Sequence, residues 1–186
     1  MREESVMEEG ALRSRRRRRT SGSTMIEATF VLMAFVAVIF LIMDLSWGVF
    51  AKLALQNAVR AGVRYAVTSQ QMTVNSKVLG QVASIQNEVE QQSMGFITDA
   101  QSTSLVSVCF YSVSSNPPTS LGCGTGASAG TTGPANSGGN LVVVSVTNYP
   151  VSPMAPLYRN ANPVQISVSS GDLIESTGSN GTAPPL

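Results

Sequence analysis

The side chains that could carry out chemistry in this chain are few. The 186 residues include eleven acids and two cysteines but no histidine, which removes the most common general base and the most common metal ligand. The acids after residue 45 are scattered, so they predict no paired-carboxylate site. The glycine-rich stretch at 122–126 lacks the strand, helix and lysine that a phosphate loop needs. We therefore expect no enzyme activity, no metal and no cofactor.

The two cysteines, Cys109 and Cys123, are too few to close a zinc site without histidine. If this part of the chain lies outside the cytoplasm, a disulfide between them is expected. Closing a loop of about 15 residues would then stabilise the fold by roughly 3 kcal/mol in the chain-entropy model. The alternative is two unpaired, buried thiols.

Basic residues crowd the N-terminus, where Arg2, Arg13 and the run 15–19 provide seven of the twelve in the chain. A run of arginines is also found in nucleic-acid-binding patches. Here an apolar segment follows within a few residues, and the rest of the chain has no basic face. The pattern therefore favours membrane topology and predicts no nucleic-acid partner.

The apolar segment is long enough to cross a lipid bilayer. Residues 28–43 contain no charge, glycine or proline, and the apolar character extends over the 25 positions from 26 to 50; a bilayer core needs roughly 20 residues. A soluble protein would have to cover such a helix on all sides, and the polar remainder of the chain is poorly suited to that. The positive-inside rule predicts residues 1–22 in the cytoplasm and residues after about 50 outside it.

One acid, Glu27, stands at the start of this apolar segment. A carboxylate near a helix N-terminus can be a simple cap, because the helix dipole favours negative charge there. The surrounding order of residues suggests more. A basic leader ends in Gly22, and a cut after it would make Ser23 the first residue and Glu27 the fifth. This order resembles the class III signal of prepilins, in which the leader is removed and the apolar helix is kept.

A motif just beyond the apolar segment strengthens this resemblance. The sequence LALQNAVRAGVRYA at 53–66 is similar to the stretch typical of the TadE-like family, the minor pseudopilins of the tight-adherence (Flp) pilus system of bacteria. The leader, the acid, the apolar helix and this motif occur in the same order in that family. The motif residues are Leu55, Gln56, Asn57, Ala58, Arg60, Ala61, Gly62, Arg64, Tyr65 and Ala66.

The resemblance implies processing by a prepilin peptidase at Gly22–Ser23 and an assembly role for Glu27. It also implies location in the bacterial inner membrane, with possible incorporation in a pilus. Its implied partners are the lipid bilayer, other pilins and pseudopilins, and the inner-membrane platform of pilus assembly. The alternative function is an uncleaved single-pass anchor that presents an extracytoplasmic binding domain.

The part after the membrane segment is expected to combine helices with a small sheet. Apolar residues at helical spacing predict that the first helix continues over 46–69, with a stripe that covers the protein's own sheet or also contacts neighbouring subunits. A second helix is predicted over 74–92, with Thr73 as its N-cap. Alternating apolar residues predict three strands, over 104–113, 141–147 and 164–169.

These elements predict an α+β fold of the type IV pilin kind: a long N-terminal transmembrane helix, a second helix and an antiparallel sheet of about three strands. Residues 114–140 are expected to form a mobile loop, and Met154, Leu157 and Tyr158 an exposed patch. The predicted domains are a cytoplasmic leader (1–22), a transmembrane helix (23–50), an extracytoplasmic domain (51–176) and a flexible tail (177–186).

Overall fold

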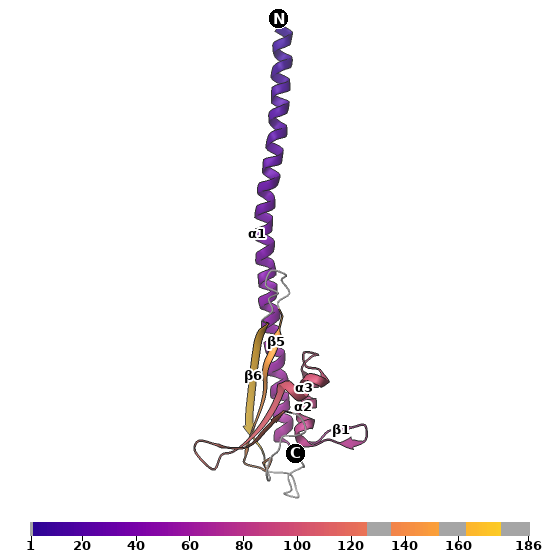
Figure 1. The fold of residues 1–186 in the computed structure, drawn as a ribbon, viewed down its shortest axis with the longest axis vertical. Helices are drawn as coiled ribbons and strands as arrows, with labels where there is room; N and C mark the ends of the chain where they lie inside the picture. The colour runs from indigo at the N-terminus through magenta and orange to yellow at the C-terminus, as the bar shows by residue number, and fades with distance from the viewer. Residues whose placement is uncertain (1, 126–134, 153–162, 176–186) are drawn as a thin grey trace. The chain divides into compact units, whose positions relative to one another are not determined.

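A computed structural model describes residues 2–125, 135–152 and 163–175 of the chain. The chain forms two compact units, Met1–Leu45 and Ser46–Leu186. Helix α1 (Arg2–Val67) supplies the first unit and the start of the second (Figure 1). The predicted tail at 177–186 and the patch of Met154, Leu157 and Tyr158 lie outside the described residues.

In the first unit, the side chains that the structure describes belong to the apolar stretch of α1 that begins at Gly22. Every described residue from Gly22 to Met43 is exposed, including Phe30 at 70% and Met33 at 69%. Gly22–Val67 is the one helix among the described residues that is long and apolar enough to cross a membrane. A helix satisfies its own backbone hydrogen bonds, so a bilayer is a suitable environment for such a surface.

The second unit is built around a four-stranded antiparallel sheet, in the order β4-β3-β5-β6. Its strands are β3 (Val106–Ser112), β4 (Thr119–Thr125), β5 (Leu141–Val151) and β6 (Val164–Leu173). The structure therefore confirms the α+β class, with one strand more in this sheet than predicted.

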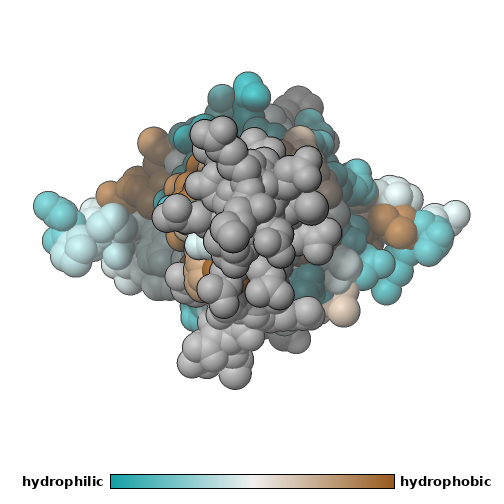
Figure 2. Space-filling model, turned by 90° about the horizontal axis from the view of Figure 1, so that it is seen from above, coloured by the Kyte–Doolittle hydropathy of each residue, from teal (hydrophilic) through white to brown (hydrophobic). Residues whose placement is uncertain are grey.

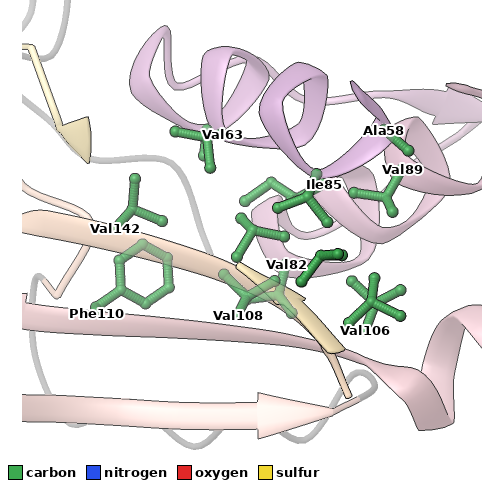
Figure 3. Packing of buried hydrophobic residues seen from close by; sticks show 14 of the residues in the cluster. Ala58, Val63, Val82, Ile85, Val89, Val106, Val108, Phe110 and Val142 are labelled. Carbon is green, nitrogen blue, oxygen red and sulfur yellow. The ribbon is translucent and has the colours of Figure 1, made fainter. Parts of the chain in front are cut away.

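Helices cover one face of this sheet, and the core lies between the two layers (Figure 3). Every second residue is buried from Val106 to Phe110 on β3 and from Val142 to Val146 on β5, as expected when one face of a strand packs against a core. Ala58, Ile85 and Val89 reach this core from α1 and α2 (Gln81–Gln92). The predicted apolar stripe on α1 thus covers the protein's own sheet.

The predicted second helix begins later than expected, because its first residues form a hairpin instead. Strands β1 (Thr73–Val74) and β2 (Lys77–Val78) pair with each other. Asn75 and Ser76 form the turn between them with φ of 50° and 62°, which is the conformation of a two-residue hairpin turn. Val74 and Val78 are exposed, so their helix-like spacing was misleading and Thr73 is not an N-cap.

Two further expectations were wrong. Ser104 and Leu105 do not begin a strand but end a short helix, α3 (Asp99–Leu105). The predicted loop at 114–140 contains strand β4, and its residues Ala135 and Asn136 are buried, while its residues 126–134 lie outside the described part of the chain. Strand β4 forms because it pairs with β3 along Ser107 to Ser112, with one register shift between Phe110 and Tyr111. Most of its own residues have low strand propensity.

In the view of Figure 2, teal (hydrophilic) covers more of the coloured surface around the grey atoms than brown (hydrophobic) does. This agrees with a second unit whose larger apolar side chains are mostly used in its own core. The exceptions, Trp47, Phe50 and Met94 among them, are therefore informative.

Candidate functional site

The proposed leader junction and Glu27 lie on the exposed surface of α1. Gly22, Ser23 and Glu27 are all exposed, and a methyl group added at Gly22 would meet no atom within 4 Å. Glu27 borders an open depression on the helix whose other residues are Thr24, Ala28, Val31, Leu32 and Phe35. It is the only charged residue between Gly22 and Met43. A lone carboxylate on so apolar a surface is costly in lipid unless it lies at the interface or meets a positive partner.

The motif at 53–66 divides into two faces of α1. Leu55, Ala58, Gly62 and Ala66 are buried in the core of the second unit. The opposite face exposes Asn57, Arg60 and Arg64, while Gln56, Ala61 and Tyr65 are half-buried. The apolar part of the motif therefore holds the fold together, and the polar part is free to face solvent or a neighbouring molecule.

Gly62 lies where α1 packs tightly against α2. A Cβ atom at this position would lie 2.5 Å from Cγ2 of Val89 and 3.6 Å from Cγ2 of Ile85. The first distance is far shorter than the roughly 3.5–4.0 Å at which carbon atoms pack. Close packing against α2 therefore explains why a glycine occupies position 62 of the motif.

Two buried glutamines on α2 join the layers of the second unit. Nε2 of Gln81 donates to the carbonyl oxygen of Ala66 at 3.1 Å, and its Oε1 accepts a hydrogen bond from Nδ2 of Asn136. Nε2 of Gln86 donates to the carbonyl oxygen of Val106 at 3.0 Å. These residues were missed in the sequence, where polar residues on a helix suggest an exposed face; only their distant partners explain their burial.

The two cysteines lie opposite each other on β3 and β4, and a disulfide joins them. Their Cα atoms are 4.0 Å apart. Cys109 alternates with the buried Val108 and Phe110, so the bond lies on the face of the sheet that points away from the helices. It fastens the edge strand β4 to the sheet.

Residues 22–64 match the family model described as TadE-like protein. This part of the chain is similar to that family, and we call it the TadE-like segment. The match covers less than a quarter of the 186 residues, and it includes the proposed leader junction, Glu27, the apolar helix and most of the motif. No curated protein and no solved structure matches the chain.

An acidic pair follows the TadE-like segment in the second unit. Burial, and after it the nearby carboxylate of Asp99, raises the pKa of Glu90; a hydrogen bond from Ser102 acts in the opposite direction. The Oε2 atom of Glu90 is buried and has no hydrogen-bond partner among the described residues. Burial of this carboxylate beside Asp99 therefore disfavours its ionised form in the folded state. Among the described residues, no group of three or more Cys, Asp or Glu could hold a metal ion.

An aromatic cluster joins the TadE-like segment to two later parts of the second unit. The ring centroid of Phe96 lies 5.6 Å from that of Trp47, 5.8 Å from that of Phe50 and 6.2 Å from that of Tyr149. Trp47 and Phe50 are themselves 6.1 Å apart. These four rings, the aromatic cluster, are spaced as aromatic pairs prefer. Sequence reasoning missed the cluster because its members come from three separate segments.

Proposed function

We propose that the chain is a minor pseudopilin, an assembly component of a tight-adherence pilus, and that a prepilin peptidase removes residues 1–22. The observation that carries the proposal is Glu27, the single charge on the apolar part of a TadE-like helix, five positions after Gly22. Both the proposed cut and the proposed pairing depend on that spacing.

The physical logic is charge pairing during assembly. A cut after Gly22 would give Ser23 a free α-amino group, which has a pKa of about 7.7–8.0 and is largely positive at neutral pH. In an apolar environment a carboxylate alone is costly, whereas a carboxylate paired with an ammonium group is tolerated. Glu27 of one subunit would thus be paired with the N-terminus of a neighbouring pilin or pseudopilin.

The rest of the proposal concerns location and partners. The arginine run would keep residues 1–22 in the cytoplasm, the helix would span the inner membrane, and the second unit would lie outside. The partners are then the lipid bilayer, the prepilin peptidase, other pilins and the assembly platform. The second unit supplies a stable fold, and we assign no catalytic role to it.

The assembly role is tested by Glu27→Gln in cells that make tight-adherence pili. This variant keeps the size of the side chain and removes its charge. We expect it to be inserted in the membrane but to be recovered less in purified pili or with other pilins, as judged by immunoblotting. Glu175→Gln is the matched control, because Glu175 is an exposed acid beyond the end of β6. If Glu27→Gln is incorporated as well as Glu175→Gln, the pairing role of Glu27 is wrong.

A further inference from the structure

The aromatic cluster borders an open groove of about 500 Å³ in the second unit. Its rim adds Met94, Gly95, Pro150, Val151 and Ser152 to the four rings. None of these described lining residues is charged. Phe50 remains 48% exposed and Met94 69% exposed, so the fold leaves a sizeable apolar surface open beside a core that is already complete.

The loop that carries Met94 and Phe96 is held in place by local contacts. Met94 and Gly95 both have positive φ, 56° and 84°, which reverses the chain directly after α2. The hydroxyl of Ser93 accepts a hydrogen bond from the backbone N–H of Ile97 at 3.1 Å, and Ile97 is anchored in the core. The exposure of Met94 is therefore a property of an ordered turn.

The position of Trp47 in the sequence indicates what could cover the apolar groove. The uncharged run after Glu27 ends at Asp44, and a carboxylate is disfavoured in the bilayer centre. The uncharged run at 28–43 is about 24 Å long at 1.5 Å per residue, so with Glu27 and Asp44 at its two ends it spans most of the roughly 30 Å of a bilayer core. Trp47 and Phe50 thus begin where the hydrocarbon ends. Tryptophan and tyrosine are enriched at that level, because each combines an apolar ring with a polar group.

We propose that the aromatic cluster, with Met94, is a lipid-binding surface that seats the second unit in the interfacial layer of the outer leaflet. The occupant of the groove is then phospholipid at the junction of acyl chain and headgroup. The surface would fix how the extracytoplasmic unit is held at the membrane before assembly. The inference rests on the membrane topology of the proposed function but not on leader cleavage or on pilus incorporation.

Trp47 is the only tryptophan of the chain and is a built-in fluorescent probe. The full chain would be placed in phosphatidylcholine–phosphatidylglycerol vesicles whose acyl chains carry bromine either near the headgroup or near the terminal methyl group. We expect the headgroup-proximal bromine to quench Trp47 more strongly. The loop is probed by moving the tryptophan, in the double variant Trp47→Phe with Met94→Trp, which should show a blue-shifted emission and the same quenching preference.

The control is Trp47→Phe with Val78→Trp, since Val78 is also exposed but lies on strand β2 and does not line the groove. Its emission should respond to aqueous iodide and not to brominated lipid. Quenching of Trp47 without quenching of the tryptophan at position 94 would overturn the inference and leave the topology intact. Absence of quenching at both positions would overturn the topology as well. A tryptophan at position 94 that is shielded from iodide only at high protein-to-lipid ratio would assign the groove to a second copy, against the proposal.

Discussion

Replacing Gly62 by alanine tests the packing of the TadE-like segment against the rest of the fold. The added methyl carbon would lie 2.5 Å from Cγ2 of Val89, so one of the two must move by about an ångström to reach normal packing distance. Val89 is fully buried on α2, and a β-branched side chain in a helix has one strongly preferred χ1. Relief by rotation of Val89 is therefore costly, and α1 and α2 are expected to separate slightly.

The expected magnitude is the balance of two terms. Alanine is favoured over glycine in a helix interior by about 1 kcal/mol, whereas overpacking of a core costs roughly 1–3 kcal/mol. We therefore expect Gly62→Ala to lower the free energy of unfolding by about 1 kcal/mol. For a unit of this size the change corresponds to a decrease in Tm of roughly 3–5 °C.

The measurement is thermal unfolding of the full chain in detergent micelles, followed by circular dichroism. Gly48→Ala is the matched control, because Gly48 lies on the same helix and a Cβ there would meet no atom within 4 Å. That variant should have an unchanged or higher Tm. The double variant Gly62→Ala with Val89→Ala should be more stable, by roughly 1 kcal/mol, than the sum of the two single effects predicts. The reason is that the methyl group added on α1 fills the space that the valine side chain leaves. Equal stability of the two glycine variants, with strict additivity at position 89, would refute the reasoning.

Three further predictions concern the second unit. Replacing both Cys109 and Cys123 by serine should destabilise it by roughly 3 kcal/mol; a Tm that does not change on reduction of the native protein would contradict a stabilising disulfide. Because burial and Asp99 raise the pKa of Glu90, the folded state binds this proton more tightly than the unfolded chain. The contribution of Glu90 to the stability of the fold is thus most favourable below the pKa it has in the unfolded chain. This contribution is lost as pH rises through the pKa it has in the folded state. Glu90→Gln should then raise Tm at neutral pH and lose this advantage in acid, and melting curves with the reverse trend would exclude the assignment. Gln81→Ala removes two buried hydrogen bonds, to the carbonyl oxygen of Ala66 and from Nδ2 of Asn136, and leaves that carbonyl only the bond from the N–H of Ser69. The loss should cost about 2 kcal/mol, visible in denaturant titration; an unchanged midpoint would show that water replaces the side chain.

The sequence was sufficient for those elements whose pattern is local. The apolar helix is evident because residues 28–43 carry no charge, and the stripe through Leu55 and Ala58 is evident because its spacing matches the helical repeat. Alternation along β5 likewise reflects one buried face, with Val142 and Val144 fully buried. In these segments the local preference and the tertiary packing agree.

The sequence was insufficient where a distant partner decides the structure. Strand β4 has two glycines and a serine between its terminal threonines, and it forms because β3 and the disulfide hold it. The hairpin before α2 imitates a helical repeat through Val74 and Val78, and only the left-handed turn between them breaks it. The burial of Gln81 depends on the carbonyl of Ala66, which lies 15 positions earlier.

The candidate site shows the same division. Gly22 and Glu27 are recognisable from their order in the chain, which the family match covers. The aromatic cluster is not recognisable, since Phe96 and Tyr149 join Trp47 only after the sheet and helices have packed. A linear motif can mark a processing signal, whereas a surface made from three segments requires the fold.

The removal of the leader is the most direct test of the proposed function. The full chain would be produced in bacterial membranes with an active prepilin peptidase, and with an inactive one as the control, and its intact mass measured after extraction. We predict that the active enzyme yields a protein that begins at Ser23 and lacks residues 1–22, and that Gly22→Leu abolishes this change. A full-length mass in the presence of the active peptidase would contradict the account, and the chain would then be an uncleaved membrane anchor.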